Sequence, residues 1–119
     1  MANEISYSGS LSFTKGVESA RLSGSGRADQ TGTDYVQATQ AIGDSQETLV
    51  KGDIGTIGWV AVRNMDDALS VQLGATTGVY SILLGPGQFF MGPWDTVNVY
   101  ALGTSASPLT KIEYLLIEA

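Results

Sequence analysis

The chain has 119 residues, which is long enough for one domain with a single hydrophobic core. It contains no histidine and no cysteine, which excludes Ser-His-Asp and Cys-His catalysis and removes the preferred ligands of zinc. Six scattered basic residues stand against twelve acidic ones, and a net charge of −6 disfavours nucleic acid and anionic membranes, because phosphate binding needs clustered Lys and Arg.

The first 32 residues are expected to form an N-terminal arm. In its first run, apolar residues alternate with serine, as in a β-strand. The apolar positions are Ile5, Tyr7, Leu11 and Phe13. A turn at Lys15-Gly16 leads into a second run, Val17–Leu22. Residues 23–32 contain no apolar side chain larger than that of Ala, and this composition predicts a flexible Gly/Ser-rich loop.

Residues 33–119 are expected to form an antiparallel β-sandwich of jelly-roll type. Short alternating apolar runs are separated by reversals too short for parallel crossovers. The runs are Thr33–Ile42, Glu47–Val50, Gly58–Arg63, Ala68–Leu73, Val79–Leu84, Gln88–Met91, Thr96–Leu102 and Lys111–Ile117. Thr33 could instead cap a two-turn helix, but the alternation of Val36, Ala38 and Ile42 with polar residues favours a strand.

Three polar or proline-containing segments predict reversals of the chain. Gly85-Pro86-Gly87 and Gly92-Pro93-Trp94-Asp95 combine a fixed proline φ with permissive glycine. Asn64-Met65-Asp66-Asp67 supplies side chains that can bond their own backbone, which predicts a hairpin turn. Its oxygens could also hold calcium, but the spacing does not match an EF-hand loop, so no metal is expected.

Some apolar residues exceed what one small core needs. Phe89, Phe90 and Met91 are consecutive and cannot all point to one face of a strand, and Leu115, Leu116 and Ile117 are typical of a central or covered strand. Aromatic residues and Met are favoured at protein interfaces. The predicted interface residues are Ile5, Tyr7, Leu11, Phe13, Phe89, Phe90, Met91, Trp94, Leu115, Leu116 and Ile117.

Several segments together resemble small jelly-roll structural proteins of tailed-phage virions. The segments are Gly58–Asn64 with the acidic turn that follows it, Leu84–Gln88 with Pro93 shortly after, Val99–Ala101 and Ile112–Glu118. The similarity covers residues 36–119, with Gln88 where Glu is expected and Gly85 in place of a polar residue before Pro86. These motifs mark strands and turns rather than a catalytic site, so any function they suggest is an analogy.

The resemblance implies a capsid decoration, or cement, protein that binds the outside of a major capsid protein shell, or else a head-fibre or tail accessory protein. Threefold positions in shell lattices favour a homotrimer. No enzymatic activity, metal or cofactor is expected, and Met1–Ile5 shows neither a basic leader nor a hydrophobic signal region, so synthesis in the host bacterial cytoplasm is expected. The alternatives are a carbohydrate-binding sandwich that stacks sugars on Trp59, Trp94 or Tyr100, and a small hydrolase with a cleft lined by two carboxylates.

Overall fold

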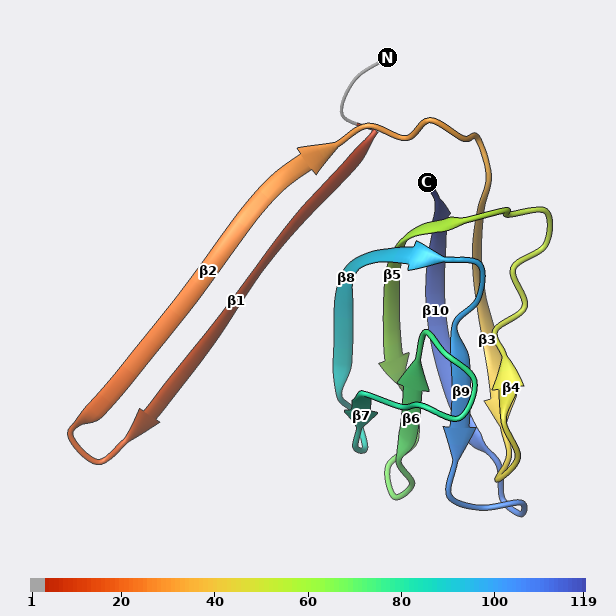
Figure 1. Cartoon of the computed structure of the whole chain (residues 1–119). Helices are drawn as coiled ribbons and strands as arrows, with labels where there is room; N and C mark the ends of the chain where they lie inside the picture. The colour runs from red at the N-terminus through yellow and green to blue at the C-terminus, as the bar shows by residue number, and fades with distance from the viewer. Residues whose placement is uncertain (1–3) are drawn as a thin grey trace. The chain divides into compact units, whose positions relative to one another are not determined.

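The computed structural model describes residues 4–119, which contain strands, turns and irregular segments and no helix (Figure 1). The strands are β1 (Ile5–Lys15), β2 (Glu18–Ala28), β3 (Tyr35–Ile42), β4 (Glu47–Thr48), β5 (Ile57–Asn64), β6 (Val71–Gly74), β7 (Ile82–Leu84), β8 (Phe89–Thr96), β9 (Tyr100–Gly103) and β10 (Thr110–Glu118). The all-β prediction is confirmed, and the segment with the helical alternative contains strand β3.

The chain divides into two compact units, residues 1–31 and 32–119, called here the arm and the body. In the arm, β1 and β2 form an antiparallel hairpin with an unbroken register from Ile5–Ala28 to Lys15–Glu18. The chain reverses through Gly16, whose φ of 61° is readily available to glycine. The hairpin is the only sheet that the structure shows within residues 4–31.

Strand β2 continues through Ala28, so the predicted loop is wrong for residues 23–28. Ser23, Gly24, Ser25 and Gly26 lie opposite Ser10, Gly9, Ser8 and Tyr7 in the ladder. Ladder hydrogen bonds join backbone groups and need no large side chain. A segment with weak side-chain signals is therefore held in strand conformation by its partner strand.

The body is a β-sandwich of two four-stranded antiparallel sheets. The first sheet has the order β3-β10-β5-β8 and the second has the order β4-β9-β6-β7. The pairing is nested along the chain, since β3 pairs with β10 and β5 with β8 in one sheet, while β4 pairs with β9 and β6 with β7 in the other. The two sheets are the layers visible in Figure 1, and they confirm the predicted antiparallel sandwich.

One hydrophobic core fills the space between the two sheets. Val60, Val62 and Leu116 reach it from the first sheet, and Val71 and Leu73 reach it from the second, each at most 2% exposed. Burying a side chain of this size contributes about 1.5–3 kcal/mol to stability. The core therefore ties the two sheets together and leaves each sheet with one outward face.

Asn64 is buried where the chain leaves the first sheet for the second. Its Nδ2 donates to the carbonyl oxygens of Leu69 at 2.8 Å and of Leu84 and Gly85 at 3.1 Å, and its Oδ1 accepts from the Asp66 N–H at 2.9 Å. The predicted hairpin turn is wrong, because β5 and β6 belong to different sheets and do not pair. The polar side chains of this segment instead stabilise the connection that passes from the first sheet to the second.

Asp66 in the same crossing holds the next residues in place. Its Oδ1 accepts from the N–H groups of Ala68 at 2.8 Å and Leu69 at 2.9 Å. These backbone hydrogen bonds, first that of Ala68 and then that of Leu69, lower the pKa of the Asp66 carboxyl. Asn64 Oδ1 and Asp66 Oδ1, two of the oxygens considered as calcium ligands, are thus engaged with backbone donors.

The predicted reversal at Gly92-Pro93-Trp94-Asp95 is wrong, because all four residues lie inside β8. Pro93 pairs with Trp59 of β5, and β8 is an edge strand of the first sheet. Proline is tolerated at an edge because its missing N–H is not needed for a second ladder. The reversal at Gly85-Pro86-Gly87 does form, with a Gln88 N–H to Gly85 carbonyl hydrogen bond of 3.1 Å.

Glu118 at the end of β10 binds two other segments of the body. Its Oε1 accepts from the N–H groups of Thr33 at 3.0 Å and Asp34 at 3.2 Å, and its Oε2 accepts from the Gly55 N–H at 3.0 Å. The hydrogen bond from Gly55 and those from Thr33 and Asp34 lower the pKa of this carboxyl. One ionised side chain thus fixes the beginning and the end of the body to each other.

Candidate functional site

The outer face of the first sheet is the candidate site. Its residues alternate with core residues along each strand, and the strand register aligns them in three rows across β3, β10, β5 and β8. The rows are Tyr35, Ile117, Trp59 and Pro93; Gln37, Leu115, Ala61 and Met91; and Thr39, Glu113, Arg63 and Phe89. We call these twelve residues the outer face.

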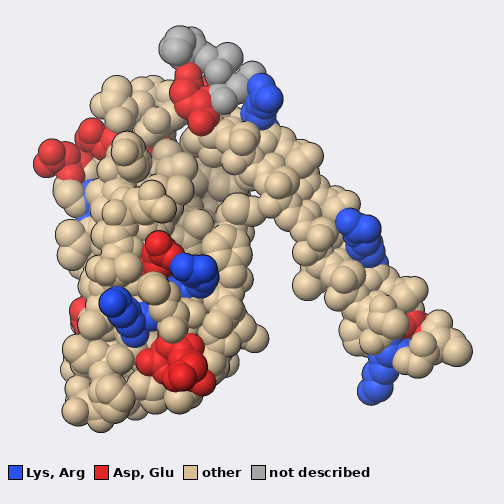
Figure 2. Space-filling view, turned by 180° about the vertical axis from the view of Figure 1, so that it is seen from behind, with Lys and Arg blue, Asp and Glu red and all other residues tan. Residues whose placement is uncertain are grey.

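Most of the outer face is apolar, and much of it is exposed. Tyr35 is 68% exposed, Phe89 58% and Met91 37%, although the sheet already has a filled core on its other side. Figure 2 views the body from this side, where uncharged surface predominates and the charged side chains gather in a few places. Contiguous exposed apolar surface of this kind is typical of surfaces that bind other molecules.

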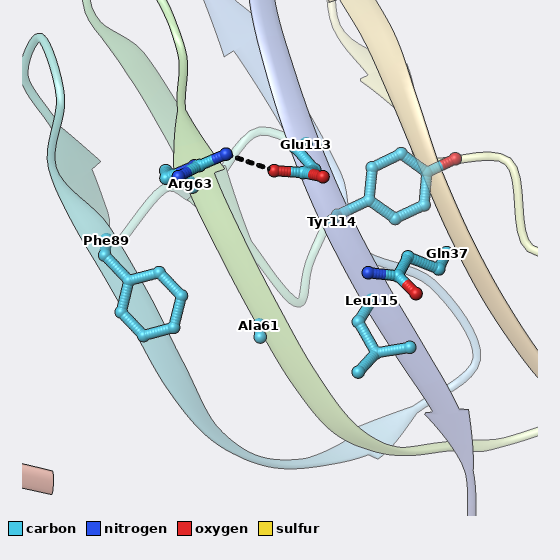
Figure 3. A pocket seen from close by; sticks show the side chains of 7 residues that line it. All are labelled: Gln37, Ala61, Arg63, Phe89, Glu113, Tyr114 and Leu115. Atoms are coloured by element: carbon cyan, nitrogen blue, oxygen red, sulfur yellow. Dashed lines mark hydrogen bonds and ion pairs between the residues drawn. The ribbon is translucent and has the colours of Figure 1, made fainter.

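A hollow of about 330 Å³ lies on the outer face, above the small side chain of Ala61 (Figure 3). Phe89 and Leu115 line it from the neighbouring strands, and Arg63 and Glu113 form an ion pair beside it. The two charged side chains are 55% and 37% exposed, so their pairing contributes at most about 1 kcal/mol to stability. The hollow therefore has apolar walls and one fixed polar border.

Tyr114 contributes to the hollow through β10, while its side chain belongs to the core between the sheets. Its hydroxyl donates to the Val50 carbonyl oxygen at 2.8 Å. Burial raises the pKa of this phenol, because the ionised form would lose its hydration. The residue belongs to the structural support of the site rather than to its surface.

The predicted interface residues of the body divide into two groups, which lie on opposite faces of the first sheet. Phe89, Met91, Leu115 and Ile117 lie on the outer face. Phe90 and Trp94 are half-buried and pack against the core, with ring centroids 6.2 Å apart in an edge-to-face arrangement. Leu116 is 0% exposed, which corrects its prediction as an interface residue, because a side chain in the core cannot reach a partner.

The predicted interface residues of the arm lie along β1. Leu11 is 78% exposed and Phe13 55%, whereas Ile5 is buried and Tyr7 is half-buried. The Tyr7 ring lies against Gly26 of the paired strand, close to where a Cβ of that residue would be. The arm therefore exposes its apolar residues mainly toward the tip.

Four apolar or aromatic residues of the outer face were not among the predicted interface residues: Tyr35, Trp59, Ala61 and Pro93. Ala61 carried no signal, because a small side chain becomes the floor of a hollow only when larger neighbours surround it. Pro93 was assigned to a turn, which removed it from any sheet face. The parity of Trp59 relative to buried Val60 could have placed it.

The aromatic residues considered for sugar stacking have different environments. The Trp94 indole N–H donates to the Asn98 carbonyl oxygen at 3.1 Å, and its ring packs against Phe90. The Tyr100 hydroxyl interacts with the side chains of Thr77 and Asn98, which lower its pKa in that order. Trp59 is the one of the three that lies on the outer face.

Comparison of the chain with models of known protein families, with curated protein sequences and with solved structures finds no match. Within residues 4–119, no three His, Cys, Asp or Glu side chains form a group that could hold a metal ion. The same residues contain no helix that is long and apolar enough to cross a membrane.

Proposed function

We propose that this chain is a non-enzymatic structural protein of a bacteriophage virion, a decoration protein that binds the outside of a major capsid protein shell. The observation that carries the proposal is the outer face, which is largely apolar, partly exposed and not needed to complete the core. Such a face is suited to binding another protein, since apolar burial is the main driving force of protein association.

The nested strand order supports the jelly-roll part of the proposal. Eight body strands in the orders β3-β10-β5-β8 and β4-β9-β6-β7 wrap as one long hairpin folded over itself. Jelly rolls of this kind occur in viral capsid proteins and in lectins. The order is compatible with the resemblance of residues 36–119 to small virion proteins. A head-fibre or tail accessory protein would have the same strand order, so these roles are alternatives within the same class of virion structural protein.

The hollow above Ala61 defines the chemistry that the proposed partner must offer. Phe89 and Leu115 favour an inserted apolar side chain, and the Arg63–Glu113 pair can accept or donate hydrogen bonds at one side. A filled central pocket is the usual position of the residues that dominate binding energy. We therefore assign the centre of the shell contact to this hollow.

The test compares Ala61→Arg with Gln72→Arg. Gln72 lies between the buried residues Val71 and Leu73 of β6, so the control adds the same charge to the other sheet. Each variant is incubated with capsids assembled from the major capsid protein encoded in the same genome, and bound protein is measured by sedimentation. Ala61→Arg should weaken binding about tenfold or more, equivalent to about 1.4 kcal/mol, whereas Gln72→Arg should bind like the wild type. Equal binding by the two variants would contradict the assigned contact, and absence of wild-type binding would contradict the decoration function.

A carbohydrate-binding module is the second candidate, and one observation favours it. Trp59 and Tyr35 lie in the same row of the outer face, separated by Ile117 of β10. Aromatic rings in a flat row can stack on sugar rings. A glycan array that shows binding lost in Trp59→Ala, together with no binding to capsids, would support this candidate over the decoration function.

A further inference from the structure

The β1–β2 hairpin of the arm has one apolar face and one polar face. Alternate cross-strand pairs define the apolar ribbon face, which ends at the tip with the charged Lys15–Glu18 pair; its other pairs are Ile5–Ala28, Tyr7–Gly26, Gly9–Gly24, Leu11–Leu22 and Phe13–Ala20. The pairs between them consist of serine, threonine and arginine: Ser6–Arg27, Ser8–Ser25, Ser10–Ser23, Ser12–Arg21 and Thr14–Ser19. The hairpin is therefore amphipathic across its thickness.

The apolar ribbon face remains open to solvent over its outer half. Leu11 and Leu22 are each 78% exposed, and Phe13 is 55% exposed. A two-stranded hairpin has no second layer to cover such a face and is marginally stable at best in water. The exposed leucine pair therefore requires a covering surface for the hairpin to be stably formed.

The apolar ribbon face has a knob and a hole at neighbouring positions. The Leu11–Leu22 pair forms the knob, and the Gly9–Gly24 pair two residues away forms the hole. A Cβ placed at Gly24 would meet no atom within 4 Å, so the hole is empty at that residue. A surface that carries matching knob and hole side by side can cover a second copy of itself.

We propose that the arm is a self-association element, in which the apolar ribbon faces of two copies pack on each other around a twofold axis. The two hairpins run in opposite directions, with the axis between the Gly9–Gly24 and Leu11–Leu22 pairs. Leu11 of one copy then lies over Gly9 of the second copy, and Leu22 lies over Gly24. The same operation brings Phe13 over Tyr7, which forms an aromatic pair between the copies.

The charges of the chain favour this contact over one between two bodies. The arm carries three acidic and three basic residues, whereas the body carries nine acidic and three basic ones. Two bodies therefore repel each other, and two arms do not.

The contact area sets the expected strength of the dimer. Strands of eleven residues span about 36 Å and a two-stranded ribbon is about 10 Å wide, which gives about 350 Å² per copy. Stable complexes bury about 800 Å² per partner. We therefore expect a weak dimer that becomes populated at high protein concentration, and this expectation is independent of what the body binds.

The first experiment measures dimerisation of the full chain by sedimentation equilibrium and compares Gly24→Leu with Ser23→Leu. Gly24→Leu fills the hole without a clash inside its own hairpin, and leucine is a better strand residue than glycine, so the hairpin should form at least as well. Ser23→Leu adds the same side chain to the polar face. Gly24→Leu should raise the dissociation constant at least about tenfold, and Ser23→Leu should leave it unchanged. Equal constants for the two variants, a wild-type trimer, or a wild-type monomer at every concentration would overturn the proposal.

The second experiment tests the register between the copies. The chain has no cysteine, so Gly9→Cys and Leu11→Cys each introduce a single thiol. When the two variants are mixed and oxidised, the twofold register places unlike thiols together and like thiols two residues apart. Disulfide-linked dimers of unlike chains should therefore predominate. A statistical mixture of the three possible dimers, or a predominance of like pairs, would contradict this register.

Discussion

The arm and the body are made from the same alternating pattern, yet they differ in how that pattern is used. In the body, the apolar parity of each strand faces another sheet, and residues such as Val62, Leu73 and Leu116 are 0% exposed. In the arm, the apolar parity of β1 and β2 has no second layer, and Leu11 and Leu22 remain 78% exposed. Alternation therefore specifies a strand, but a second layer is what converts it into a stable core.

The largest expected effect is the difference between one Leu→Asp substitution in the body and the same substitution in the arm. Leu116→Asp places a carboxylate in the core of the body, and a buried unpaired charge costs more than about 4 kcal/mol, out of a total of about 5–15 kcal/mol for a domain. The body should therefore lose a large part of its stability and melt at a much lower temperature than the wild type. Leu11→Asp makes the same change on the exposed arm and should leave the thermal melt of the body unchanged. Circular dichroism melts of the two variants test the contrast, and a similar loss in both would show that the two regions unfold as one.

Asn64→Ala should weaken the body without affecting the hairpin. The substitution leaves the carbonyls of Leu69 and Leu84 and the N–H of Asp66 without their side-chain partner. The expected loss is about 2–3 kcal/mol of unfolding free energy, measured by urea denaturation. Asn98→Ala is the control, because its side chain makes only a 3.4 Å contact to the Tyr100 hydroxyl and should cost less than about 1 kcal/mol. Equal losses would contradict the role assigned to Asn64.

The smallest expected effect concerns the acid stability of the body. The folded-state pKa of Glu118 is lowered, so its contribution to stability is fully present above the ordinary glutamate pKa and is lost as pH falls through the lowered value. Glu118→Gln should reduce stability at neutral pH, and its difference from the wild type should shrink toward acid. Glu18→Gln, at the tip of the arm, should leave the acid part of the body's stability curve unchanged. Thermal melts across this pH range provide the measurement, and a constant difference between Glu118→Gln and wild type would contradict the sign.

Much of the body could be read from the sequence because its signals are local. Period-two alternation in segments such as Val71–Leu73 and Ile112–Leu116 predicts strands, and Gly85-Pro86-Gly87 predicts a reversal wherever it occurs. The run Leu115–Ile117 predicted a central or covered strand, and β10 does lie between β3 and β5. These inferences succeed because a residue's backbone preference and its parity are fixed by its own sequence neighbourhood.

The sequence by itself determined that the chain is all-β and which alternate residues of each strand form its apolar face. The tertiary structure decided the rest, because those outcomes depend on residues distant in the chain. Residues 23–28 form a strand because β1 pairs with them, and Pro93 continues β8 because that strand lies at an edge. Ala61 becomes the floor of a hollow only between Phe89 and Leu115. The surface of a sheet is assembled from several strands, so no single segment of sequence contains it.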